Sequence, residues 1–279
     1  MKKVEKVFQH LVSMFKAKKI IGIPQLVSSD RLLEARVALI TGGSSGIGKA
    51  IAEAFMRNGC KVIVTGRDEQ KLKRCLEDFG ESGSKKVRYL VMDITKTCEI
   101  KTKVREALMY WGKIDILVNS AGVLAHNNFF NMTETEYTTI MDTNVKGIYF
   151  LSQVVAEYMI ENNVKGNILN ITSSSAIRPA WTPYQISKWS VRGMTLGLAD
   201  LLIPYGITVN ALAPDPVATP MLGIKENDSL FKGDSPSGRY AKPEEIANMA
   251  VILVSDMGKL IVGDTVYMTG GSGTITLHN

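Results

Sequence analysis

The chain has few of the residues that build disulfide frameworks and metal centres. Its 279 residues include only three cysteines, Cys60, Cys75 and Cys98, which are widely spaced, and its three histidines do not cluster. Disulfide-rich and zinc-binding folds need paired cysteines, or cysteines and histidines at short spacings. We therefore expect no disulfide framework and no metal site, and a reducing compartment, the cytoplasm, as the default location.

A long apolar run is also missing. No segment reaches the roughly 20 consecutive apolar residues that span a bilayer as a helix. The N-terminus carries lysines without a continuous apolar stretch behind them, which argues against a secretory signal peptide. At 45% hydrophobic and 22% charged residues, the composition suits a globular protein with a sizeable core.

An excess of charge of one sign is confined to the N-terminus. The net charge is +6, and residues 1–20 alone hold six lysines and one glutamate, so the rest of the chain is nearly neutral. A neutral body gives no reason to expect nucleic acid as a partner.

The basic segment has an apolar stripe at helical spacing, which predicts an amphipathic helix followed by a linker over residues 1–34. This helix could pack on the body or on a second subunit, attach to a membrane surface as a peripheral contact, or be disordered. The stripe consists of Val4, Val7, Phe8, Leu11 and Phe15.

The remainder, residues 35–279, reads as one domain in which short apolar segments alternate with helical patterns. There is no internal repeat and no break in composition. Such alternation predicts an α/β fold of the Rossmann-like, doubly wound type, with a seven-stranded parallel sheet and helices on both faces. The expected strands are residues 37–41, 61–65, 87–91, 116–119, 167–171, 208–212 and 265–269.

A glycine-rich loop follows the first expected strand and opens a helix that we expect over residues 46–58. Gly42 allows a tight turn, Gly46 lets the backbone approach a phosphate, and Gly48 lets helix and strand pack closely. The free N–H groups at the helix start would bind a pyrophosphate. The alternative is a tight turn without a ligand. The expected cofactor contacts in this loop are Gly42, Ser44, Ser45, Gly46, Ile47 and Gly48.

The end of the second expected strand indicates which dinucleotide binds. A carboxylate there would bind the ribose 2′-hydroxyl of NAD. Here Thr65 and Gly66 occupy the strand end, and Arg67 follows, whose planar guanidinium suits a 2′-phosphate. We therefore expect NADP(H) rather than NAD(H). Asp68 is the opposing candidate, although we expect it to cap the next helix.

Tyr184 and Lys188 stand four residues apart, one turn along a helix if the segment is helical. Free tyrosine has a pKa of about 10, and a fixed positive charge nearby lowers it. Such a tyrosine could exchange a proton with an alcohol or carbonyl oxygen. Taken alone, the pair could equally be two residues on a solvated helix face.

Together these motifs, in order and spacing, resemble the short-chain dehydrogenase/reductase family in its single-domain form, from about residue 37 to the C-terminus. The loop of residues 41–48 is similar to the family's TGxxxGxG motif, and Tyr184 and Lys188 are similar to its YxxxK pair. Ser173, after the fifth expected strand, resembles the catalytic serine, and Asn144 resembles the family's helix asparagine.

Other short segments carry the same resemblance and imply further contacts with the cofactor. Residues 119–122 are similar to the NNAG motif, with serine for its second asparagine, and residues 214–219 to the loop that holds the nicotinamide carboxamide. The implied contacts are Asp93, Ile94, Asn119, Ala121, Gly122, Tyr184, Lys188, Pro214, Val217 and Thr219.

The resemblance implies an oxidoreductase that moves a hydride between NADP(H) and a carbonyl or secondary alcohol. Tyr184 would be the general acid–base, and Lys188 would lower its pKa and hold the ribose hydroxyls. Ser173 would bind the substrate oxygen, with its neighbours Ser174 and Ser175 competing for that role. Asn144 would bind a water that links Lys188 to solvent, unless it is an ordinary buried amide. The family also implies a homodimer or homotetramer.

Two features depart from the family pattern. Ser173 and Tyr184 are eleven residues apart, two fewer than the commonest spacing, which shortens the loop of residues 176–183. Asp215 stands where the family usually has glycine. If that glycine served a positive φ, aspartate could adopt it at modest cost. Asp215 could bind a substrate hydroxyl, but we expect it to shape the turn.

The substrate pocket should be formed by residues 124–130, 176–183 and 220–239, the last being a glycine-rich lid. Alternative functions are a non-catalytic NADP-binding regulator, or a reductase for a 3-oxoacyl, steroid or sugar substrate that residues 1–20 hold at a membrane. Candidate apolar lining residues are Leu124, Phe129, Phe130, Trp181, Met221, Leu222 and Phe231.

Overall fold

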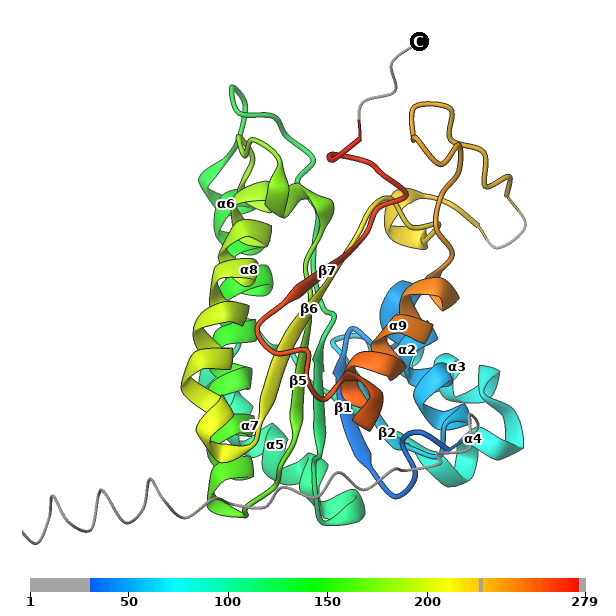
Figure 1. The fold of residues 1–279 in the computed structure, drawn as a ribbon, viewed down its shortest axis with the longest axis vertical. Helices are drawn as coiled ribbons and strands as arrows, with labels where there is room; N and C mark the ends of the chain where they lie inside the picture. Colours follow the sequence, from blue (N-terminus) through cyan, green and yellow to red (C-terminus); the bar gives the residue numbers. More distant parts are fainter. Residues whose placement is uncertain (1–30, 226–227, 276–279) are drawn as a thin grey trace, which may run out of the picture.

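The computed structural model describes residues 31–225 and 228–275, which form a seven-stranded parallel sheet (Figure 1). The strand order is β3-β2-β1-β4-β5-β6-β7, which is a Rossmann-like, doubly wound arrangement. All strands are parallel, and the order in which the chain adds them to the sheet reverses between β1 and β4. The strands are β1 Val37–Thr41, β2 Lys61–Gly66, β3 Val87–Val91, β4 Ile116–Asn119, β5 Asn167–Ile171, β6 Thr208–Pro214 and β7 Thr265–Met268. All seven expected strands are thus present, with ends that differ by two residues at most.

Helices cover both faces of the sheet (Figure 1). One side carries α2, α3 and α9, and the other carries α5, α7 and α8. The α-helices are α2 Gly46–Arg57, α3 Glu69–Asp78, α4 Gly80–Lys86, α5 Thr97–Trp111, α6 Glu134–Met141, α7 Ile148–Glu161, α8 Pro183–Leu202 and α9 Pro243–Val254. A π-helix, η1 Asp142–Gly147, joins α6 to α7, and short 3-10 turns lie at η2 Ser174–Ile177, η3 Ile203–Tyr205, η4 Pro220–Leu222 and η5 Asp256–Gly258.

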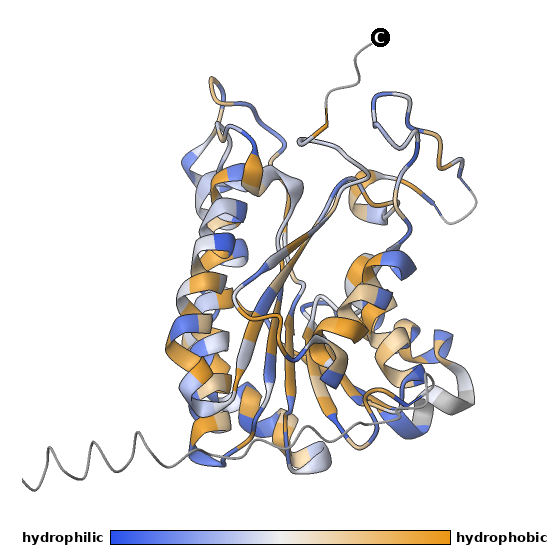
Figure 2. Cartoon of the chain, viewed as in Figure 1, coloured by the Kyte–Doolittle hydropathy of each residue, from blue (hydrophilic) through white to orange (hydrophobic). Residues whose placement is uncertain are grey.

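The central strands are apolar along their whole length because the helices remove both faces from water. Every residue of β1 and of β4 is buried. Their side chains therefore divide between two apolar cores, as buried parallel strands require. Figure 2 shows the same pattern, with apolar residues concentrated along the strands and on the helix sides that face them.

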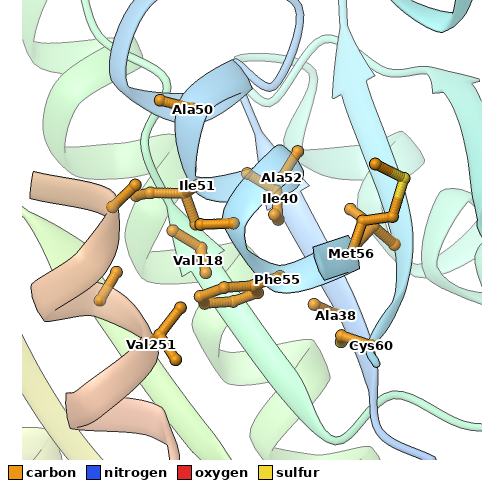
Figure 3. Packing of buried hydrophobic residues seen from close by; sticks show 14 of the residues in the cluster. Ala38, Ile40, Ala50, Ile51, Ala52, Phe55, Met56, Cys60, Val118 and Val251 are labelled. Atoms are coloured by element: carbon orange, nitrogen blue, oxygen red, sulfur yellow. The ribbon is translucent and has the colours of Figure 1, made fainter. Parts of the chain in front are cut away.

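Helix α2 is anchored to the sheet and to α9 by its apolar side. Phe55 and Ile51 are fully buried and point toward Val251 of α9, over Val118 of β4 (Figure 3). Burial of an aromatic or aliphatic side chain of this size stabilises a fold by about 1.5–3 kcal/mol. This packing fixes the start of α2 beside the end of β1, where the glycine loop lies.

Helix α8 begins at a defined residue. Pro183 occupies its first turn, and Thr182 and Gln185 form a capping box, in which Thr182 Oγ1 accepts from the Gln185 backbone at 3.3 Å and Gln185 Oε1 accepts from the Thr182 backbone at 3.0 Å. The cap sets the rotation of the first turn. It therefore orients Tyr184, which directly follows Pro183.

The packed body begins before β1, with Leu33 from the segment expected as linker and Arg36 next to the strand. Leu33 is fully buried against the α2 core, and Arg36 donates to the carbonyl of Val254 at 2.6 Å and to Asn167 Oδ1. The expected amphipathic helix of residues 1–20 lies outside the described residues. Within the described part of the chain, no helix is long and apolar enough to cross a membrane, and no metal-binding group of histidine, cysteine and carboxylate residues occurs.

Candidate active site

A cavity of about 320 Å³ opens at the carboxyl ends of β1, β4, β5 and β6, next to the reversal of strand order. Ligands bind at this place in doubly wound sheets. Thirteen of the expected site residues line it, namely Gly42, Ser45, Gly46, Ile47, Gly48, Ala121, Gly122, Ser173, Tyr184, Lys188, Pro214, Val217 and Thr219.

Tyr184 and Lys188 lie on adjacent turns of α8 with Lys188 Nζ 5.5 Å from the centre of the Tyr184 ring. Lys188 is 6% exposed, and its Nζ donates to the carbonyl oxygen of Ile171 at 3.1 Å. Nothing in this arrangement resembles a solvated helix face. The ammonium group instead lies inside the cavity wall, between β5 and the phenol.

Burial determines the protonation behaviour of both groups. It lowers the pKa of Lys188 to about 8, because the charged ammonium is removed from water. It also raises the pKa of Tyr184, and the charge of Asp215 adds to this rise, whereas a hydrogen bond with Ser173 opposes it. The direction is opposite to the lowering expected from the sequence, because loss of hydration is the largest influence on the phenol.

The serine positions are resolved by the structure. Ser173, directly after β5, lines the cavity and donates from Oγ to Ser175 Oγ at 3.2 Å, while the Ser175 backbone donates to Ser173 Oγ at 3.1 Å. Ser175 lines the same cavity. Ser174 does not line it, and its buried Oγ has no partner among the described residues. Two of the three serines therefore face the phenol side of the cavity.

Asn144 is fully buried in η1 and fixes the segment after β4. Its Oδ1 accepts from the backbone of Val123 at 2.9 Å, and its Nδ2 donates to the Val123 carbonyl at 2.9 Å and to Ser187 Oγ at 3.1 Å. Ser187 in turn donates to the Tyr184 carbonyl at 2.6 Å. Asn144 is thus tied to α8 one residue from Lys188, and its side-chain amide is occupied by protein partners.

The glycine loop forms a cradle that side chains would fill. Gly42 has φ +63°, and a Cβ there would lie 2.9 Å from Ala121 Cα; a Cβ on Gly48 would lie 2.4 Å from the Gly42 carbonyl oxygen. Ser45, the N-cap of α2, makes no side-chain capping bond, and the first turn of α2 carries no acidic residue. The N–H groups of this turn are therefore available to an anion.

A second cavity of about 200 Å³ adjoins the loop at the ends of β2 and β3. The buried hydroxyls of Thr65 and Thr143 line it, and neither has a partner among the described residues. Together with the open helix start, these orphaned groups fit the adenosine half of a dinucleotide. The expected residues that line it are Gly42, Ser44, Ser45, Arg67, Asp93, Ile94, Ala121 and Gly122.

Arg67 is exposed at the rim of this second cavity and makes no hydrogen bond or ion pair with any described residue. Asp68 accepts from the Lys71 backbone at 3.1 Å and caps α3, as expected. Lys71 also lines the cavity, a contact that we did not anticipate. A carboxylate cap followed three residues later by an exposed lysine is the signal that could have identified it.

Asn119 differs from the other expected cofactor contacts. It is fully buried at the end of β4, outside both cavities, with Nδ2 donating to Asn170 Oδ1 at 2.8 Å and to Ser152 Oγ at 3.0 Å. Its side chain joins β4 to β5 and α7. The adjacent strand end is held by Thr41 Oγ1, which accepts from the backbones of Ser120 and Ala121.

Asp215 lines the cavity but does not shape a turn in the way expected. Its φ is not positive, so a left-handed conformation was not the constraint at this position. Its Oδ2 instead accepts from Arg178 Nη2 at 2.6 Å. The two departures from the family pattern, the short loop and the aspartate, thus meet in one ion pair.

The expected apolar lining is only partly present. Leu124, Met221 and Leu222 line the cavity. The four aromatic candidates do not, because they lie on loop tips with most of their surface in solvent: Phe129 is 67% exposed, Phe130 94%, Trp181 57% and Phe231 76%.

The chain matches a family model described as enoyl-(acyl carrier protein) reductase over residues 42–273. It is 35% identical over 242 residues to a hydroxy(phenyl)methylsuccinyl-CoA dehydrogenase subunit, BbsD, of Thauera aromatica, covering 86% of this chain and 97% of that protein. Among solved structures, a gluconate 5-dehydrogenase from Burkholderia cenocepacia in complex with NADP and tartrate is similar, with TM-score 0.80, 29% identity, and coverage of 88% and 99%. A 3-ketoacyl-(acyl-carrier-protein) reductase from Brucella melitensis complexed with NADH has TM-score 0.79, 32% identity, and coverage of 87% and 100%.

The chain therefore belongs to the short-chain dehydrogenase/reductase family. This membership places it among the oxidoreductases that interconvert carbonyl and alcohol groups. The two similar structures hold NADP in one case and NADH in the other, so the cofactor preference of this chain has to be argued from its own residues.

Proposed function

We propose that this protein is an NADP(H)-dependent oxidoreductase in which Tyr184 exchanges a proton with the oxygen of a carbonyl or secondary-alcohol substrate. The observation that carries the proposal is the convergence of Ser173, Tyr184 and Lys188 on one cavity that continues to the glycine loop. The complete set of groups also argues against a non-catalytic regulator of the same fold.

The bound dinucleotide would supply or accept the hydride. Ser173 and Ser175 would hold the substrate oxygen by hydrogen bonds. In reduction, the Tyr184 hydroxyl would give its proton to that oxygen; in oxidation, the phenolate would take it back. Lys188 would hold the ribose hydroxyls and stabilise the phenolate. Asn144 would keep the segment after β4 and the first turn of α8 in register, with a water relay as its further role.

Preference for NADP(H) over NAD(H) rests on Arg67 and Lys71. Both line the adenosine-side cavity, and the one carboxylate at the end of β2 is occupied in capping α3. We expect NADPH to bind more tightly than NADH. Arg67→Ala should weaken NADPH binding by roughly ten- to a hundredfold, the usual loss for a charged hydrogen bond, and leave NADH nearly unaffected.

Fluorescence titration of both dinucleotides tests this preference. Arg74→Ala is the matched control, because Arg74 lies on α3, the helix that follows Arg67, is exposed, and lines neither cavity. Equal wild-type affinities for NADPH and NADH would overturn the assignment.

The substrate would carry an apolar part beside its carbonyl, because Leu124, Met221 and Leu222 line the cavity. A panel of ketones, β-keto esters and sugar-derived ketones, followed by NADPH absorbance, would rank the classes. Faster turnover of the sugar-derived ketones than of the apolar ones would contradict this inference.

We further propose a homodimer or homotetramer formed through α7 and α8. Their outer faces expose large apolar side chains, including Leu196 at 64% and Leu201 at 62%. Light scattering of Leu196→Glu should show a smaller species than the wild type.

A cytoplasmic location and peripheral membrane contact through residues 1–20 remain predictions. Liposome flotation with and without those residues tests the membrane contact.

A further inference from the structure

The contact between Arg178 and Asp215 joins two side chains to which neither catalysis nor cofactor binding has given a role. Arg178 lies directly after η2, on the shortened loop, and Asp215 lies directly after β6. Their side chains are 38% and 19% exposed, and Nη2 lies 2.6 Å from Oδ2. A pair of this length and partial burial is more strongly coupled than an ion pair on an open surface.

Two further contacts position Arg178, one at its guanidinium and one at its backbone carbonyl. A Cβ on Gly273 would lie 2.6 Å from Arg178 Nε, so the C-terminal segment, red in Figure 1, lies directly against it. Nε itself is buried and has no partner among the described residues. The Arg178 carbonyl accepts from Trp189 Nε1 at 2.9 Å, which ties the loop to α8. The arginine is therefore fixed in place beside the carboxylate.

Asp215, unlike Arg178, lines the cavity that contains Tyr184. A carboxylate there opposes the negative charge that forms on a phenolate or on a substrate oxygen. Its charge contributes to the raised pKa of Tyr184 even with Arg178 in place. A glycine, usual in the family at this position, would impose no such opposition.

We propose that Arg178 is a positioning residue that holds Asp215 against the cavity wall and neutralises its charge, so that negative charge can form on Tyr184 and the substrate oxygen. The inference rests on the proposed role of Tyr184 as the acid–base. It assigns the shortened loop a purpose, which is to place a cation behind the aspartate.

Few other charges face this centre. On α8 there is Lys188, and the segment from Asn119 to Leu124 carries no ionisable side chain. In the lid, the charge of Asp215 contributes to a raised pKa of Lys232, but Lys232 forms its ion pair with Asp234. Groups farther out are engaged elsewhere: Asp142 with Lys146 in η1, Glu136 with the backbone of His126, and Arg192 with the carbonyl of Ala176 beside Tyr267.

The test is a double-mutant cycle on the full chain with Arg178→Gln, Asp215→Asn and both together. The first readout is the ultraviolet absorbance of the Tyr184 phenolate during an alkaline titration, isolated by subtracting the same variant with Tyr184→Phe. It needs no substrate, and circular dichroism at each pH confines it to the folded range.

We expect Asp215→Asn to move Tyr184 ionisation to lower pH by on the order of one unit, and Arg178→Gln to move it to higher pH. The double variant should behave as Asp215→Asn alone, because Arg178 acts only through the carboxylate. Arg178→Lys should restore wild-type titration. A merely structural arginine would leave the titration unmoved, or shift it equally with and without Asp215, and either result overturns the proposal.

The second readout is the pH dependence of kcat/KM for oxidation of cyclohexanol with NADP+. The acidic limb should move in the same directions as the phenolate titration. If Tyr184→Phe keeps wild-type turnover, the proposed function fails, while the phenolate cycle still decides whether Arg178 neutralises Asp215. If Tyr184→Phe is inactive but the pH of Tyr184 ionisation is the same in all variants of the cycle, only the inference about Arg178 fails.

Discussion

Lys188 Nζ lies 5.5 Å from the centre of the Tyr184 ring and donates its hydrogen bond to a backbone carbonyl rather than to a carboxylate. The two residues therefore share a cavity wall in which neither charged form is well solvated. Both pKa shifts favour the neutral pair, a raised one for the phenol and a lowered one for the amine. A bound ligand with hydroxyl or carbonyl groups would supply further hydrogen-bond partners to the buried phenol and amine.

The burial of Lys188 makes stability depend on pH. The unfolded chain keeps this proton up to a pH of about 10.5, whereas the folded chain releases it near 8, so the unfolded state holds more protons between these values. Stability from this group therefore rises with pH across the interval, and the full cost of burying the ammonium is present below pH 8. Lys188→Met should raise the free energy of unfolding at pH 7 by roughly 2–3 kcal/mol, with no gain above pH 10.5.

Urea denaturation of the cofactor-free protein at pH 7 and pH 10 measures this difference. Lys101→Met, at an exposed position of α5, is the control and should leave the pH dependence unchanged. A Lys188→Met variant that is equally destabilised at both pH values would contradict the assignment of the cost to charge burial.

Gly48 tests the cofactor cradle separately from the chemistry. Gly48→Ala places a Cβ 2.4 Å from the Gly42 carbonyl, which has to move the loop that would hold the pyrophosphate. We expect NADPH affinity to fall at least tenfold, which corresponds to about 1.4 kcal/mol. Gly197→Ala on α8 meets nothing within 4 Å, so it should keep the affinity and raise stability by roughly 0.5–1 kcal/mol. Unchanged NADPH binding in Gly48→Ala would show that the cofactor does not use this loop.

Asn144 should matter for both stability and turnover. Asn144→Ala leaves the backbone groups of Val123 without partners, at a cost of about 1–3 kcal/mol. It also releases the link through Ser187 to α8, so kcat should fall while NADPH still binds. Asn162→Ala removes an exposed amide at the end of α7 and is the control, which should change neither quantity appreciably. Full activity in a destabilised Asn144→Ala would restrict Asn144 to a structural role.

Local sequence patterns were sufficient to predict the fold, and the family resemblance pointed to residues that the structure brings together in one cavity. Strands such as Val37–Thr41 consist mostly of apolar residues because helices cover both faces of the sheet. The glycine loop can be recognised from its position between a strand and a helix. The family resemblance named Ser173, Tyr184 and Lys188, which lie directly after β5 and in the first turns of α8 and line one cavity.

What could not be predicted depends on contacts between distant segments. The ion pair of Arg178 with Asp215 joins residues that are 37 positions apart, and no local pattern encodes it. The pKa of Tyr184 was expected to fall from its spacing to Lys188, but the depth of the cavity determines its direction. The side chain of Asn119 joins β4 to β5 and α7, because its amide donates hydrogen bonds to Asn170 and Ser152 inside the core.

The role of Tyr184 is tested most directly by single-turnover and steady-state reduction of an accepted ketone by Tyr184→Phe with NADPH. Phenylalanine keeps the ring in the cavity wall and removes only the proton, so kcat should fall by roughly 10²–10⁴-fold. The NADPH dissociation constant should change little, and Tyr205→Phe, at a half-exposed position outside the cavity, should behave as wild type. Turnover in Tyr184→Phe within a few-fold of wild type would contradict the account.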